Sequence, residues 1–274
     1  MLTCTHRVRI LASGLAFATL VLGPPLSAHA VTPALSVGTE HSLALRSDGS
    51  VFAWGSDRDG QLGQGRQTYE SRPGLVVGLS GVKAIGIGPN HSLAIRSDGS
   101  LWTWGSNGNG QLGDDSTDFR SEPVQARAIS RVSAACGGDY FSAALDQDGA
   151  VWTWGDHATM GSGALESTRI PAKLPGISGI QALACGSGHI LALRQDGKVW
   201  AWGTNDEGQL GDASRTQRLT PVEVRGLSNV KAITAGNEFS AALTHDGTVW
   251  EWGVMSPFNT PRGAPRTVPV QTPG

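Results

Sequence analysis

The stretch GTEHSLALRSDGSVFAWGSDRDGQLG, residues 38–63, decides the fold because the chain repeats it. Its Trp-Gly pair recurs at intervals of 50, 50, 48 and 50 residues. An Asp-Gly pair starts six residues before each of these tryptophans, and another glycine lies ten residues before each aspartate. The tryptophans are Trp54, Trp104, Trp154, Trp202 and Trp252, and the leading glycines are Gly38, Gly88, Gly138, Gly186 and Gly236. The pattern indicates five repeats of about 50 residues, at 34–80, 81–130, 131–179, 180–228 and 229–274.

Each repeat predicts four short strands. The first covers 83–88 and its equivalents, the second 41–46 and the third 51–54. The Asp-Gly pair between the second and third strands favours a two-residue type I′ hairpin. The fourth strand begins near a proline, which cannot donate a ladder hydrogen bond, so we expect it at the sheet edge. These prolines are Pro73, Pro123, Pro171, Pro221 and Pro269.

Alternation along the strands predicts how the sheets pack. Leu43 and Leu45 share one face of the second strand, and Ala44 and its equivalents face the other way. Alanine there in every repeat indicates a close neighbour. All nine tryptophans fall on two alternate positions of the third strand. We interpret them as packing between adjacent sheets, because a side chain that recurs in every copy does the same work in each; stacking on a carbohydrate is the alternative.

Four-stranded sheets of this length in series are typical of propeller blades, so the predicted fold class is an all-β propeller of four-stranded antiparallel blades. The motif G-x-x-H-S-x-A-L-x-x-D-G-x-V-x-x-W-G, followed by G-Q-L-G, resembles the repeat of the regulator of chromosome condensation family. It recurs at 88–113 and, with Ile190 in place of serine, at 186–211. The third and fifth repeats carry Phe141 and Phe239 in place of the histidine. The resemblance covers residues 34–271.

That family usually closes a ring of seven blades, whereas this chain has five repeats. We favour a closed five-bladed ring, and hence a monomer, because residues 32–38 supply a first strand and 267–271 a last one. The alternative is an open arc, whose exposed sheet edges favour association.

The N-terminus predicts export. Arg7 and Arg9 precede a 13-residue, mainly apolar run at 10–22, and Ala28-His29-Ala30 follows. This order is that of a secretory signal peptide, and the run is shorter than the ~20 residues of a membrane span. We therefore expect cleavage after Ala30, a mature domain at 31–274, a periplasmic or secreted location and no membrane insertion. The net charge then changes from −2 to −4, which offers no surface for nucleic acid.

The sequence shows no clear motif for a metal site, a cofactor site or a catalytic site. His41, His91 and His189 share a repeat position and would suit a metal, but phenylalanine in the other two repeats favours packing. The loops at 57–60, 107–110 and 205–208 only partly resemble calcium loops, which indicates turns. We therefore expect no metal, no cofactor and no catalytic residue, and no enzyme.

Cys136 and Cys185 remain after export. They lie one position out of phase in the repeat register, so on regular strands they face opposite sides. This favours two free, buried thiols over a disulfide.

Function is expected where the repeats diverge, in the loops between the third and fourth strands. Aromatic and arginine residues are typical of protein interfaces. The candidates in these loops are Arg66, Tyr69, Phe119, Arg120, Arg215, Arg218 and Phe258. The sequence thus favours a non-catalytic, exported scaffold that binds a protein partner. The alternatives are nucleotide exchange on a small GTPase of a foreign cell, which the family resemblance suggests, and a propeller lyase or hydrolase.

Overall fold

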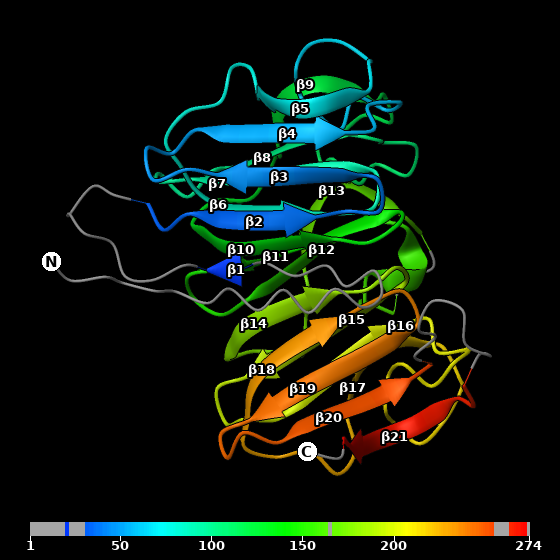
Figure 1. Ribbon diagram of the computed structural model, residues 1–274. Helices are drawn as coiled ribbons and strands as arrows, with labels where there is room; N and C mark the ends of the chain where they lie inside the picture. Colours follow the sequence, from blue (N-terminus) through cyan, green and yellow to red (C-terminus); the bar gives the residue numbers. More distant parts are fainter. Residues whose placement is uncertain (1–19, 22–30, 164–165, 255–262, 273–274) are drawn as a thin grey trace, which may run out of the picture.

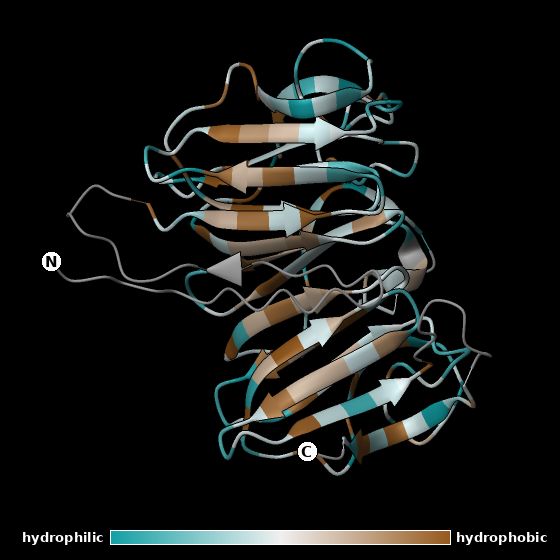
Figure 2. Cartoon of the chain, in the orientation of Figure 1, coloured by the Kyte–Doolittle hydropathy of each residue, from teal (hydrophilic) through white to brown (hydrophobic). Residues whose placement is uncertain are grey.

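The computed structural model describes residues 20–21, 31–163, 166–254 and 263–272. They form five antiparallel sheets arranged as an arc, from the first sheet in blue to the fifth in orange and red (Figure 1). Apolar residues concentrate in the strands and hydrophilic residues in the loops (Figure 2). The all-β propeller architecture is therefore confirmed.

Each sheet contains four consecutive strands in chain order, innermost first, and the first sheet has β1 as a fifth strand. The first sheet contains β2 (Ala34–Val37), β3 (His41–Leu45), β4 (Val51–Gly55) and β5 (Glu70–Leu75); the second contains β6 (Val82–Ile87), β7 (His91–Arg96), β8 (Leu101–Gly105) and β9 (Arg120–Gln125); the third contains β10 (Val132–Gly137), β11 (Phe141–Asp146), β12 (Val151–Gly155) and β13 (Thr168–Lys173); the fourth contains β14 (Ile180–Cys185), β15 (His189–Arg194), β16 (Val199–Gly203) and β17 (Arg218–Glu223); the fifth contains β18 (Val230–Ala235), β19 (Phe239–Thr244), β20 (Val249–Gly253) and β21 (Arg266–Gln271). A two-residue strand, β1 (Leu20–Val21), pairs with β2, and a 3-10 helix, η1 (His157–Thr159), follows β12.

The prolines mark edge strands, as predicted. Pro73 lies in β5, which pairs only with β4, and the prolines of the other four repeats lie in the matching outer strands. Since proline has no N–H, its place at the edge leaves no ladder bond unmade.

The hairpin turn differs from the type I′ prediction. Gly49 has a φ of 80°, but Asp48 does not have a positive φ. Gly49 N donates to Arg46 O, and Arg46 N donates to Ser50 O. The connection is therefore a three-residue loop, a type I turn followed by a left-handed glycine. Asp48 stabilises it because its Oδ1 accepts a hydrogen bond from Ser50 N.

The tryptophan of each Trp-Gly pair packs its sheet against the preceding sheet. Trp104, Trp154, Trp202 and Trp252 are fully buried, and their indole N–H groups donate to a carbonyl of the preceding sheet's loop. The predicted inter-sheet packing is therefore confirmed for these four. Trp54 belongs to the first sheet, has no preceding sheet and is only half-buried.

The structure does not confirm a closed ring. Each innermost strand from β6 to β18 packs on the first two strands of the preceding sheet. Within the described residues, no packing of that extent joins β18 or β19 to β2. The leading glycines show the same order: a Cβ at Gly38, Gly88, Gly138 or Gly186 would closely approach the carbonyl of the next glycine, whereas the three atoms nearest to one at Gly236 all belong to Phe239.

The prediction of two free cysteines is wrong, because Cys136 and Cys185 form a disulfide between the third and fourth sheets. The two residues do lie on opposite sides of equivalent strands. Opposite sides of neighbouring sheets, however, are the sides that meet, so Cys136 on β10 faces Cys185 on β14 with a Cα–Cα distance of 5.7 Å. The phase difference that argued against the bond is what allows it.

Candidate functional site

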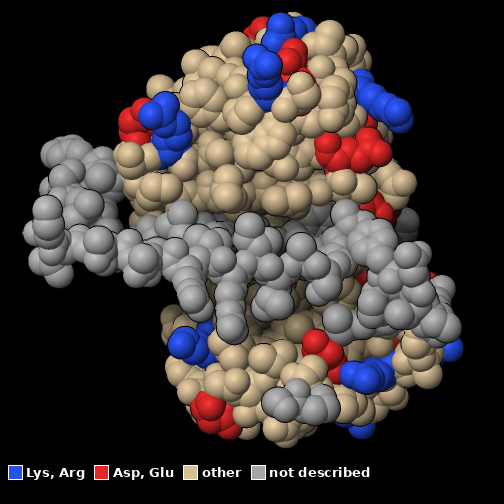
Figure 3. All heavy atoms as spheres, viewed as in Figure 1, with Lys and Arg blue, Asp and Glu red and all other residues tan. Residues whose placement is uncertain are grey.

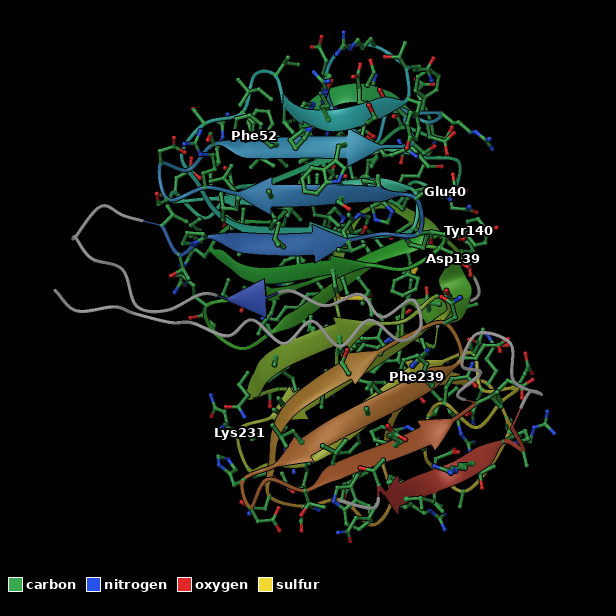
Figure 4. All side chains as sticks on the ribbon, viewed as in Figure 1. Glu40, Phe52, Asp139, Tyr140, Lys231 and Phe239 are labelled. Carbon is green, nitrogen blue, oxygen red and sulfur yellow. A yellow bond between two sulfur atoms is a disulfide. The ribbon has the colours of Figure 1, made fainter. Side chains whose placement is uncertain are left out.

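Two sets of loops leave the sheets at one end and form a surface that we call the loop face. The first set joins the first and second strands of each sheet, and the second set joins the third and fourth strands. The Asp-Gly hairpins lie at the opposite end. Figure 4 places Glu40, Asp139 and Tyr140 at the loop end of the sheets and Lys231 at the hairpin end.

The first set of loops surrounds the mouth of the central channel. A cavity of about 500 Å³ there is lined from all of the sheets. Asp139 N donates to Ser187 O at 2.9 Å, and Ser187 Oγ donates to Asn237 Oδ1 at the same distance. Burial raises the pKa of Asp139, and its hydrogen bond with Ser187 opposes the shift. Neighbouring sheets are therefore joined by polar contacts at this rim.

Inside the channel the lining is uncharged. The innermost strands of the sheets enclose a cavity of about 520 Å³. Its walls are alanine, isoleucine, leucine, glycine, serine, threonine and the cysteines of the disulfide. These lining residues include neither acid–base groups nor charged side chains.

Carboxylates gather in a recess of about 280 Å³ over the third, fourth and fifth sheets. The acidic lining residues are Asp139, Asp156, Asp206, Glu207 and Glu238. No lysine or arginine is among the residues that line this recess. Figure 3 shows further acidic side chains along the loop-side edge of the first sheet. Acidic side chains therefore outnumber basic ones in the lining of this recess.

Large exposed aromatic side chains lie on the loop face. Tyr69 is 73% exposed, Tyr140 57% and Phe119 52%. Tyr69 also lines a cavity of about 410 Å³ together with Glu40 and Arg58. The structure thus places the two described aromatic candidates from the sequence on the expected surface, and Phe258 lies outside the described residues. Tyr140 was not predicted, because it belongs to the short first set of loops.

The candidate arginines make contacts within their own loops. Arg120 pairs with Asp114 and Arg218 with Asp212, at 2.7 Å and 2.6 Å. The other two also bind locally: Arg66 pairs with Glu70, and Arg215 donates to Asp206 O. These arginines therefore shape the loops on which the aromatic residues are carried.

An asparagine organises the loop of the second sheet, and Asn205 does the same in the fourth. Asn107 Oδ1 accepts from Leu112 N, and its Nδ2 donates to Asp114 and to carbonyls of the loop. The side-chain oxygens that resembled calcium ligands thus hold turns. Within the described ranges, no group of three histidine, cysteine or acidic side chains is placed to hold a metal ion.

The three histidines are separated, each in a different interface between sheets. Nε2 of His41, His91 and His189 contacts the hydroxyl of Ser92, Ser142 and Ser240, respectively, in the next sheet. Burial lowers the pKa of His41 and His189 to about 3 and that of His91 to about 4. Neutral rings in these contacts fit the packing interpretation of this position.

The sequence model of the RCC1-like domain matches residues 21–273. The chain belongs to the RCC1-like family. Human RCC1 domain-containing protein 1 is 41% identical over 58 residues, which are 21% of this chain and 15% of that protein. Human E3 ubiquitin-protein ligase HERC2 is 38% identical over 52 residues, 19% of this chain and 1% of that protein.

Solved structures of other proteins match over most of this chain. Human WBSCR16 has 27% identity and a TM-score of 0.70, covering 76% of this chain and 56% of that one. Prp20p from Saccharomyces cerevisiae has 23% identity and a TM-score of 0.73, covering 88% and 65%. The RCC1-like chain described here therefore spans less than two thirds of each of these relatives. No helix among its described residues has the length and apolar character to cross a membrane.

Proposed function

We propose that this RCC1-like protein is a non-catalytic scaffold that binds another protein on its loop face. The observation that carries the proposal is the position of the exposed aromatic residues: Tyr69, Phe119 and Tyr140 all lie in loops of this one face. Aromatic side chains that are solvated in the free protein and fixed on a rigid sheet framework are typical interface anchors.

Charge indicates the kind of partner. The acidic recess lies beside Tyr140, which is itself among the residues lining it. A partner segment rich in lysine or arginine matches both the carboxylates and the aromatic ring, since cations also interact with aromatic faces. Binding of such a segment weakens as salt is added. The likeness to Prp20p, whose structure is described with its binding to Gsp1p and histones, is consistent with a protein partner for this fold.

The proposed location is outside the cytoplasm, after cleavage at Ala30. The disulfide between Cys136 and Cys185 supports this, because such bonds persist mainly in oxidising compartments. Nucleotide exchange on a small GTPase remains the second candidate, and a nucleotide-release assay with the captured partner distinguishes it from plain binding.

The experiment uses purified mature protein to capture a partner from the envelope and secreted fractions. The affinity of the captured partner for the mature protein is then measured by titration. The triple variant Tyr69→Ala, Phe119→Ala, Tyr140→Ala should weaken binding by about 2 kcal/mol or more, roughly 30-fold. Leu75→Ala, an equally exposed apolar residue on edge strand β5, is the matched control and should bind normally. Unchanged binding by the triple variant would exclude the loop face.

A further inference from the structure

The first sheet has one side that no other sheet covers, which we call the first end face. Leu35 and Val37 on β2 lie on this side with Ser42, which pairs with Val37, and Trp54, which pairs with Ser42. Leu35 is 42% exposed and Val37 48%, whereas Ile85 and Ile87, their equivalents on β6, are 5% and 3% exposed. The side chains are those of an inter-sheet core, but the second half of that core is absent.

Three of the four interfaces between sheets share one hydrogen-bond arrangement. At the first of them, the Gln61 carbonyl accepts both from Ser92 Oγ at 2.8 Å and from Trp104 Nε1 at 2.9 Å. His41 Nε2 contacts the same Ser92 hydroxyl at 3.0 Å. Each sheet thus offers a histidine and a loop carbonyl, and the next sheet offers a serine and a tryptophan. The second and fourth interfaces repeat the arrangement, with His91–Ser142 and His189–Ser240.

At the third interface both members of the pair change together. Phe141 replaces the histidine, and Ile190 replaces the serine of the next sheet; both are buried in one apolar cluster. An imidazole against an isoleucine, or a hydroxyl against a phenylalanine, would leave a buried polar atom without a partner. Histidine therefore goes with serine and phenylalanine with isoleucine.

The first end face carries the receiving half of the histidine type. Within the described part of the chain, no residue makes a hydrogen bond to Ser42 Oγ or Trp54 Nε1. A matching sheet must therefore present an imidazole opposite Ser42 and a free loop carbonyl opposite Trp54. It must also bring apolar side chains to Leu35 and Val37.

The fifth sheet of this protein does not match. It presents Phe239 where a histidine is required. It also carries Glu251, at a position where the other four sheets have a buried alanine or threonine. A charged residue is costly to bury between sheets. The two outer faces are thus unlike: that of the fifth sheet carries Phe239 and Glu251, and that of the first sheet carries the receiving half of an interface.

We propose that the first end face docks a blade of the same repeat type carried by a different polypeptide, one that presents a histidine to Ser42 and a Gly-Gln-Leu-Gly loop carbonyl to Trp54. The docked blade extends the series of inter-sheet interfaces by one on the side of β2. This surface is separate from the loop face, so the two proposals stand independently.

A photo-crosslink tests the occupant directly. Mature protein with a benzophenone side chain at Val37 is irradiated in envelope and secreted fractions, and the joined peptides are sequenced. The matched control places the same group at Val270, an equally exposed valine on β21. The expected product joins residue 37 to a repeat-containing polypeptide, next to its histidine. Ser42→Ile, which fits phenylalanine and not histidine, should reduce this product roughly tenfold, the effect of one unpaired buried polar group.

Other products would overturn the proposal. A crosslink within one molecule to 229–272 shows a closed ring, and one between isotope-labelled and unlabelled copies shows self-association. A product with a protein lacking such repeats, or none above the Val270 control, shows that no blade docks there. A purified variant gives a second test: Phe239→His with Glu251→Ala supplies the histidine and removes the charge, so crosslinking to residue 37 of its own kind should rise above that of the parent. No rise would count against the pairing of histidine with Ser42.

Discussion

Acid should destabilise this protein through its three inter-sheet histidines. Burial lowers the pKa of His41 and His189 from 6.5 to about 3, and that of His91 to about 4. Between these values and 6.5 the unfolded chain binds protons that the folded chain does not. The free energy of unfolding therefore falls as the pH drops through that window. At about pH 5 each histidine costs roughly 2 kcal/mol, and the three together roughly 6, against a typical stability of about 5–15 kcal/mol.

The decisive variant is His189→Phe with Ser240→Ile, which copies the Phe141–Ile190 pair of the third interface. It removes one titrating ring and leaves no unpaired hydroxyl. Urea unfolding followed by tryptophan fluorescence measures the result. The stability lost between about pH 6 and pH 5 should be about one third smaller in the variant than in the parent, because two of the three titrating rings remain.

Two comparisons separate the contribution of the histidines from other effects of pH on stability. Burial raises the pKa of Asp57 and Asp139, which opposes the histidines because these carboxyls hold a proton longer in the folded state. The opposing contribution is the same in both proteins and cancels in the difference. Phe141→Leu, in the interface without a histidine, should lower stability equally at every pH. An unchanged pH dependence in the double variant would refute the assignment of the acid response to these rings.

Three further results are expected. Thiol titration of denatured, non-reduced mature protein should find no free thiol, and Cys136→Ser with Cys185→Ser should lower the free energy of unfolding by about 4 kcal/mol, the chain-entropy value for a loop of this length. Trp154→Ala should cost about 3–5 kcal/mol in urea unfolding, whereas Trp54→Ala should cost less than half of that, because Trp54 is half-buried and its indole N–H has no hydrogen bond within the described ranges; equal losses would show that Trp54 is covered in solution. Terminal sequencing of exported protein should begin at Val31, and an intact segment 1–30 would refute the export proposal.

The repeats allowed most of the fold to be predicted, because each level of the pattern agrees with the others. The spacing of Trp-Gly and Asp-Gly located the sheets, and proline located the edge strand. The turn type was wrong because Asp-Gly suits more than one loop length, and the choice depends on how the flanking strands pair. In the structure Arg46 pairs with Ser50, which leaves three residues in the loop and not two.

Relations between sheets were harder to predict than relations within them. The cysteine argument compared faces of a single sheet, whereas Cys136 and Cys185 meet because different sheets present opposite faces to each other. Ring closure depends on the angle between sheets, which the repeat period does not encode. A signal for the end of the array was nevertheless present in Glu251, the one charged residue at a position where the other repeats have alanine or threonine.

The site was found only in part for a related reason. The prediction rested on the long, divergent loops that carry Tyr69 and Phe119, and it did not consider the three-residue loops between the first and second strands. Those short loops diverge too: residues 139–140 are Asp-Tyr, where the second repeat has Pro-Asn and the fourth Ser-Gly. Because these loops converge on the channel mouth, a change of two residues in them alters the central surface more than a longer insertion in the outer loops, between the third and fourth strands.

The disulfide and the histidine contacts divide the interfaces between them. Three interfaces have a buried His–Ser contact. The remaining interface, between the third and fourth sheets, has Phe141 against Ile190. That interface is the one that Cys136 and Cys185 bridge. The disulfide does not change in the pH range where the histidines protonate. Acid therefore weakens three interfaces between sheets and leaves the disulfide-linked interface intact. The arc thus has two independent kinds of joint, one sensitive to protons and one to reductant. A partner that contacts several sheets on the loop face, or a blade docked at the first end face, stabilises the arc in addition to these two kinds of contact.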